Sequence, residues 1–306
     1  MAPYFIELSA EGVEPVRLNG TAGSLSGLGI VGRGIEGWDS TPTTKVDAVA
    51  RSAGDGGHDI DAGNILYASR TVKVNWAAYG DNRQSVHELT DSLRRFVHRL
   101  VTMRVVDGEQ DTYCEHGYFS MDQASVYRHA TTDASSFTIV FERPERLSTH
   151  TQRIQVNCPS NITGGGLTYN PDLLLTTLDG DIAIRYPLTY DMPGDEALTN
   201  TGLLHNTGTS RAYPVLTVCG DLPEGIHITF PGTGLELACS RPINPAVPLV
   251  LDCRSRTASM GGTDISESLT KRGFPMIDPD GTLKVLTLTT TPTSAWIECI
   301  AHDTWM

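Results

Sequence analysis

Short segments in which apolar and polar residues alternate, separated by turn residues, run along almost the whole chain. At residues 72–76, for example, Val72, Val74 and Trp76 alternate with polar side chains. A period of two is typical of half-buried β-strands. Turn-forming residues are abundant as well, with 30 Gly and 17 Pro among 306 residues. This pattern predicts a mainly β protein made of many short strands.

One segment departs from this period. Its apolar residues have the spacing of one face of an amphipathic helix: Val86, Leu89, Leu93, Phe96, Val97 and Leu100. Ser85 and Glu88 have the spacing of a capping box, which predicts that the helix begins at Ser85. We therefore expect one helix over about 85–100, with this apolar stripe packed on a sheet.

The charged sequence Arg143-Pro144-Glu145-Arg146 predicts a break between two parts of the chain. Residues 1–150 include the expected helix, whereas 151–306 contain strand and turn patterns at the short spacing of a sandwich. We expect an N-terminal β-sandwich or barrel-like domain with one helix, followed by a C-terminal β-sandwich. Residues 20–37 and 51–64 are expected to be loops, and residues 114–121 a hairpin.

The sequence contains several partial matches to catalytic and cofactor motifs, and none of them has the whole pattern that the chemistry requires. Residues 32–37 match GxGxxG, but the following WDSTP cannot form the helical turn that holds a dinucleotide. His58, Asp59 and Asp61 have neither a helical HxxxH spacing nor a further clustered ligand. Three carboxylate pairs lie beside Gly or Pro, where Asp commonly supports turns: Asp179/Asp181, Asp195/Glu196 and Asp278/Asp280. We expect no enzyme, with no catalytic, cofactor-binding or metal-binding residues.

Composition restricts the possible partners. Lys and Arg number 23 and Asp and Glu 36, so the formal charge is −13, which opposes phosphate binding and argues against a nucleic-acid-binding function. No apolar run approaches the ~20 residues of a membrane helix, and residues 1–20 lack a signal-peptide pattern. The six cysteines show no CxxC pairing, so we expect reduced thiols that are mostly buried.

Several segments, taken in order, resemble the distal tail protein family of long-tailed, non-contractile bacteriophages. In the first half they are the strand RTVKVNW directly before the expected helix, the run TYCEHGYF and the strand FTIVFERP. In the second half they are NTG followed by AYPVLTVCG, then LVLDC, and the final strand AWIECIAHDTWM: residues 70–76, 112–119, 137–144, 206–208, 212–220, 249–253 and 295–306. Residues 51–64 and 159–200 match nothing in this pattern.

The resemblance implies a structural protein of the virion, located at the tail tip and assembled in the host cytoplasm. It implies that the N-terminal domain forms a hexameric ring and that the C-terminal domain is a galectin-like β-sandwich projecting outward. The implied partners are the tail tube protein, the tail hub or tail-associated protein, the tape measure protein and receptor-binding proteins. Genomic DNA would only pass through the central opening, and no membrane insertion is implied.

Two other classes of function remain open at this point. A carbohydrate-binding host-adhesion module would need an aromatic platform, and Trp296 on the last expected strand is a candidate, although it fits a core or interdomain position as well. A glycoside or peptidoglycan hydrolase would need a carboxylate pair or a zinc motif. Carboxylate pairs are placed by the fold and cannot be recognised from spacing, and no zinc motif is present.

Overall fold

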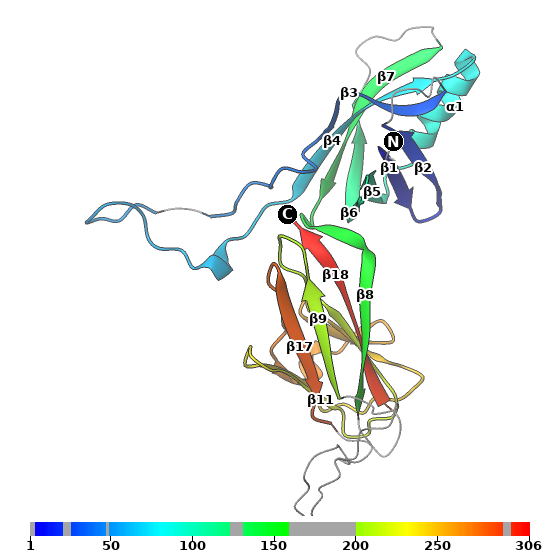
Figure 1. The fold of residues 1–306 in the computed structure, drawn as a ribbon. Coiled ribbons are helices and arrows are strands. Elements are labelled where there is room, and N and C mark those ends of the chain that lie inside the picture. The colour runs from blue at the N-terminus through cyan, green and yellow to red at the C-terminus, as the bar shows by residue number, and fades with distance from the viewer. Residues whose placement is uncertain (1–3, 21–25, 47–48, 123–130, 159–199, 290–294) are drawn as a thin grey trace, which may run out of the picture.

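The computed structural model describes residues 4–20, 26–46, 49–122, 131–158, 200–289 and 295–306. The chain is mainly β, as the alternating pattern predicted, and its elements form an upper barrel and a lower sandwich (Figure 1). The barrel strands are β1 (Tyr4–Ala10), β2 (Val13–Asn19), β3 (Gly27–Glu36), β4 (Arg70–Tyr79), β5 (Leu100–Asp107), β6 (Gln110–Met121) and β7 (Thr132–Phe141).

The barrel closes on itself. Its strands follow the order β6-β5-β1-β2-β3-β4-β7, and β6 also pairs with β7 from Gly117↔Phe141 to Met121↔Phe137. All neighbours are antiparallel except β2 and β3, which meet in parallel at the single pair Asn19↔Gly29. Alternate residues of each strand point inward and form one core, which includes the fully buried Ile6, Leu8, Trp76, Phe137 and Phe141.

Helix α1 (Arg83–Arg94) covers one side of the barrel and packs on β4 and β7 (Figure 1). The expected range 85–100 was wrong at both ends. Asn82, not Ser85, is the N-cap: its side chain accepts a hydrogen bond from the Ser85 backbone N–H, and the Ser85 hydroxyl faces back toward the Asn82 N–H. Asn and Ser are similarly good N-caps, and here Asn82 occupies the N-cap position. The helix therefore begins at Arg83, before Ser85. Val86, Leu93 and Phe96 are buried as predicted.

The end of the expected helix also differs. Val97 and Leu100 are exposed, and β5 begins at Leu100. His98 has φ 64°, a left-handed conformation that stops a helix. The pairing of β5 with β1 and β6, made with residues far away in the sequence, therefore overrides the helical spacing of the last two apolar residues.

Two segments differ from expectation, one expected to be a loop and one expected to be a hairpin. Residues 27–36, part of the expected loop 20–37, form β3 and pair with β4. Gly32 and Gly34 have positive φ and lie where the register with β4 shifts between Ile30 and Ile35, so the glycines form a bulge inside a strand rather than a loop. Residues 114–121, expected to be a hairpin, belong to the single strand β6, and the turn lies at Gly108 instead.

The second half is a sandwich of two sheets. One face continues the barrel sheet through six strands: β8 (Arg146–Cys158), β18 (Ala295–Trp305), β10 (Val215–Cys219), β13 (Leu249–Asp252), β14 (Thr257–Met260) and β15 (Thr263–Asp264). The other face has five strands: β16 (Leu269–Arg272), β12 (Leu235–Cys239), β11 (Ile226–Phe230), β17 (Gly281–Thr287) and β9 (Thr201–Asn206).

A second core fills the space between these sheets, and it includes four of the six cysteines. All six are free thiols; five are buried and Cys219 is half-buried. Burial raises the pKa of the Cys114 and Cys299 thiols to about 12. These cysteines therefore act as small apolar residues, as expected.

The link between barrel and sandwich is a strand, not a flexible connection. β8 begins at Arg146 and runs through the expected division at 150/151. Its first residues pair with β6 of the barrel (Tyr113↔Leu147), and the whole strand, from Arg146 to Cys158, pairs with β18 of the sandwich. The two cores, one within residues 6–141 and one within residues 156–301, are consequently joined by one continuous hydrogen-bonded ladder.

The NTG segment at residues 206–208 has a structural role. Asn206 is fully buried; its amide donates to the Ser210 carbonyl at 2.7 Å, and its Oδ1 accepts from the backbone N–H of Thr304 at 3.2 Å. A Cβ on Gly208 would lie 2.0 Å from the Thr304 carbonyl oxygen. Only glycine fits this close approach, so the segment fixes the last strand against the turn after β9.

Candidate functional site

The candidate residues that the structure describes lie in separate places and are not brought together into one group. His58, Asp59 and Asp61 are on an exposed segment, where Asp59 pairs with Arg51 at 2.8 Å and Asp61 accepts from the Gly63 N–H. Across the described ranges, no group of three His, Cys, Asp or Glu side chains is arranged to hold a metal ion. Asp278 and Asp280 form the turn before β17, and the pairs Asp179/Asp181 and Asp195/Glu196 lie outside the described residues.

The most prominent surface feature is a long excursion between β3 and β4, residues 37–69, which we call the arm (Figure 1). It projects away from the barrel, and apart from the short 3-10 turn η1 (Ala62–Asn64) its described part has no helix or strand. Four of its apolar side chains are exposed: Val49, Ile60, Ile65 and Leu66, the largest fraction being 64% at Val49. Exposed apolar residues gathered on an extended segment are typical of an interaction surface.

The root of the arm is anchored by a buried arginine. Arg70 is 1% exposed, and its guanidinium donates to the carbonyls of Trp38 at 2.6 Å, Gly37 at 2.9 Å and Ser40 at 2.8 Å. Its Nε donates to the Pro144 carbonyl at 2.7 Å. Burial lowers the pKa of Arg70. One side chain thus holds the start of the arm against the segment that leads into the sandwich.

Neighbouring side chains reinforce this junction. Arg146 pairs with Asp39 and lies over the Trp38 ring, with 5.8 Å from the guanidinium carbon to the ring centroid. Glu145 pairs with Arg254 of the sandwich at 2.8 Å, and both side chains are largely buried. The arm root, the linker and the sandwich therefore meet at one place. The sequence predicted the break at residues 143–146, but no local pattern marked Arg70 as its anchor.

A basic hollow of about 410 Å³ lies on the barrel between the β1–β2 turn and the end of α1. Its lining includes Arg94, Arg95, His98 and Arg99. Arg94 pairs with Asp91, and Arg99 donates to the Glu11 carbonyl at 2.7 Å. Positive charge is favoured near a helix C-terminus, and Glu14 adds one carboxylate to this lining. In Figure 1 this region and the arm lie on different sides of the barrel.

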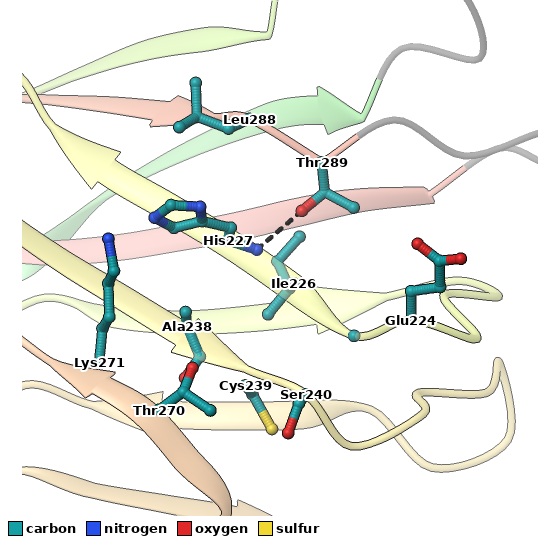
Figure 2. Close-up of a pocket in the computed structure, with 11 residues that line it drawn as sticks. Glu224, Ile226, His227, Ala238, Cys239, Ser240, Thr270, Lys271, Leu288 and Thr289 are labelled. Atoms are coloured by element: carbon teal, nitrogen blue, oxygen red, sulfur yellow. Dashed lines mark hydrogen bonds between the residues drawn. The ribbon is translucent and has the colours of Figure 1, made fainter.

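A second hollow, of about 430 Å³, lies on the outer face of the five-stranded sheet (Figure 2). It is lined by side chains of β11, β12, β16 and the segment after β17, among them His227, Lys271 and Thr289. The His227 backbone N–H donates to the Thr289 hydroxyl at 2.7 Å, which the dashed line in Figure 2 marks. Glu236 accepts from the Lys271 ammonium and lies 2.7 Å from His227 Nε2.

The charges in this hollow are balanced. The bonds from Lys271 and, to a lesser degree, His227 lower the pKa of Glu236, so this side chain is a carboxylate at neutral pH. One carboxylate thereby orients two donors from neighbouring strands. No sequence motif marks this group, because its members come from three strands and are brought together only by the sheet register.

Trp296, the candidate aromatic platform, lies elsewhere. It is half-buried on the outer face of β18, beside Asn157 of β8 and Cys219 of β10 in the register. Because β18 belongs to the six-stranded sheet, Trp296 and the hollow of Figure 2 are on opposite sheets of the sandwich. The described helices include none long and apolar enough to cross a membrane.

Comparison with known proteins shows a similarity of fold. No protein-family model matches the chain, and no curated protein matches it. The crystal structure of the Dit protein of SPP1, described as a paradigm of the hub adsorption apparatus in phages that infect Gram-positive bacteria, matches with a TM-score of 0.57 at 10% identity. The match covers 98% of this chain and 99% of that one.

Two structures of the phage p2 baseplate in its activated conformation, with Sr and with Ca, match less well. Their TM-scores are 0.47 and 0.43, each at 10% identity and with 98% of both chains covered. The match to the SPP1 Dit structure shows that the overall fold of this chain is similar to that one, over both the barrel and the sandwich.

Proposed function

We propose that this chain is a structural protein of the tail tip of a phage with a long, non-contractile tail. The observation that carries the proposal is the correspondence with SPP1 Dit over 98% of the chain, barrel and sandwich together. The segments that resemble the distal tail protein family, which occur in the same order along this chain, support the proposal independently. In this proposal the protein has no catalytic role and no cofactor, and it resides in the virion after assembly in the host cytoplasm.

We further propose that six copies form a ring through the barrel domain. The arm supports self-association, because its exposed apolar residues Ile65 and Leu66 have no core to join in their own chain. The arm and the basic hollow lie on different sides of the barrel (Figure 1). A contact between the arm of one copy and the side of the next copy's barrel that carries the basic hollow would join two different surfaces, so it would be a heterologous interface. Repeating a heterologous interface gives a closed ring when the rotation between neighbouring copies divides a full turn evenly.

The proposed ring connects the tail tube protein on one side with the tail hub or tail-associated protein on the other. The galectin-like sandwich then projects outward, toward receptor-binding proteins, while the tape measure protein is a further partner. Genomic DNA only passes through the opening. The chain charge of −13 favours this passage, because negative walls repel phosphate rather than bind it.

The first test is the mass of the purified full-length protein by native mass spectrometry, together with negative-stain images. We expect a particle of six 33.1 kDa chains with a central opening. The double variant Ile65→Ser/Leu66→Ser is then expected to reduce the assembly to smaller species while leaving the far-UV circular dichroism unchanged.

The matched control is Leu203→Ser, which changes an apolar side chain of similar exposure on the sandwich. It is expected to leave the ring intact. A wild-type protein that is monomeric at micromolar concentration and gives no ring images would contradict the proposed ring. A ring that survives the arm variant would leave the ring in place and exclude the arm as its contact.

A further inference from the structure

We propose that the hollow on the five-stranded sheet of the sandwich (Figure 2) is a binding site for a neutral carbohydrate. This would add a ligand-binding activity to the structural role, and it does not depend on the ring. Three features support the site: the size of the hollow, the mixture of donors and acceptors along it, and the way these groups are held.

The size and shape fit a small polar ligand. A volume of about 430 Å³ falls in the range of about 300–1,000 Å³ that is usual for small-molecule sites. The hollow is open on the sheet surface rather than enclosed. A ligand bound there stays partly in contact with water. A sugar keeps hydrogen bonds between its hydroxyl groups and that water, whereas an apolar molecule would leave apolar surface exposed.

The lining has donors and acceptors in alternation. Lys271 and His227 lie on one part of it, Glu224 lies on another, and the hydroxyls of Ser240 and Thr270 add groups that both donate and accept (Figure 2). A sugar hydroxyl also donates and accepts at once, so this mixture matches a row of hydroxyls. An anionic ligand would instead need an excess of cations, and the carboxylates of Glu224 and Glu236 remove that excess.

The donors are already oriented. Glu236 Oε2 engages both the Lys271 ammonium and His227 Nε2, and the His227 backbone N–H holds the Thr289 hydroxyl. Lys271 uses one of its three N–H donors in the described hydrogen bonds, so donors are left for a ligand. Because the side chains are held before binding, less conformational entropy is lost when a ligand arrives. Glu236 is thus a positioning residue, and Lys271 and His227 are binding residues.

Apolar surface completes the site. Ala238 lies between the polar side chains on β12, and Leu288, which is 53% exposed, borders the hollow beside β11 (Figure 2). The C–H groups of a sugar ring need such a surface.

The experiment is saturation-transfer difference NMR on the full-length protein with glucose, galactose and N-acetylglucosamine, and with glucuronic acid as an anionic probe. We expect transfer to at least one neutral sugar, with a dissociation constant in the millimolar range, and weaker or no transfer to glucuronic acid. Lys271→Met is expected to weaken binding at least about tenfold, since it removes a charged hydrogen-bond donor. Glu236→Gln is expected to weaken it too, because the Lys271 ammonium and the His227 ring lose the carboxylate that holds them.

The matched control is Lys284→Met, which removes the same charge from the same sheet face on β17 but lies outside the hollow. It is expected to bind as the wild type does. Loss of binding with Lys284→Met as well would mean a diffuse charge effect and would overturn the site. Binding that is lost with Trp296→Ala and kept with Lys271→Met would move the site to the opposite sheet. No transfer to any neutral sugar, or transfer to glucuronic acid alone, would also overturn the proposal.

Discussion

Replacement of Arg70 by Met should destabilise the barrel strongly. The guanidinium donates to four backbone carbonyls, and two of these bonds, to Trp38 and Pro144, are buried, whereas those to Gly37 and Ser40 are part-buried. Met has a similar length and no donor. Water can reach the two part-buried carbonyls, but the two buried ones would lose their partner.

The magnitude follows from these two groups. A buried polar group left without a partner costs about 1–3 kcal/mol. Two such carbonyls give a loss of roughly 2–6 kcal/mol in the free energy of unfolding of the barrel. Arg70→Lys should lose less, because the ammonium can still donate to one or two of the carbonyls.

The assay is urea unfolding followed by tryptophan fluorescence and circular dichroism. Trp38 and Trp76 are buried in the barrel part, so their emission reports its unfolding. The matched control is Arg104→Met, since Arg104 is also a barrel arginine, but its pair with Asp111 is partly exposed. Exposed pairs contribute about 0.2–1 kcal/mol. If Arg70→Met lost no more stability than Arg104→Met, the reasoning about the buried carbonyls would be refuted.

Four further predictions follow from the packing and the charges. Leu93→Ala should cost about 2–5 kcal/mol in urea unfolding, and Leu100→Ala, exposed on β5, less than about 0.5 kcal/mol; equal losses would contradict the helix packing. Gly208→Ala should cost about 1–3 kcal/mol, since its Cβ would meet backbone 2.0 Å away, and an unchanged midpoint would contradict this. The hydrogen bond from Arg104 lowers the pKa of Asp111, so this pair stabilises the fold above the unfolded pKa of about 3.9, and the contribution is lost as the pH falls from there through the lower folded pKa. Asp111→Asn should therefore reduce the difference in the free energy of unfolding between pH 7 and pH 3. Thiol titration should find six reactive groups per denatured, non-reduced chain and few in the native protein, and two or fewer after denaturation would mean disulfides.

Much of the fold could be predicted from local pattern, because a half-buried strand carries its own period. The alternation at Val72, Val74 and Trp76 gave β4, and all three residues are buried in the barrel. Strand β3 could not be found in this way. Its glycines read as a loop, and only the ladder with β4, which is supplied by residues about 40 positions later, makes them a bulged strand.

The candidate sites were harder to predict, since their residues converge only in three dimensions. In the sequence, His227 and Glu236 look like ordinary outward-facing residues of two strands. Their contact arises only because β11 pairs with β12. The same is true of Arg70, which looks like an ordinary polar residue at the start of a strand. A buried cation is recognised only when the carbonyls around it are known.

The junction has a consequence for how the two halves work together. The last strand reaches the linker, where Thr304 pairs with Leu147 and Trp305 with Arg146, so the end of the chain lies next to the residue that pairs with the arm root. Rotation between barrel and sandwich would break this ladder together with the Glu145–Arg254 pair. The rotation would cost free energy because both the backbone hydrogen bonds of the ladder and the partly buried ion pair would be broken at the same time. We therefore expect the sandwich to follow the barrel as one body, so that any partner which tilts the arm root also reorients the sheet that carries the hollow.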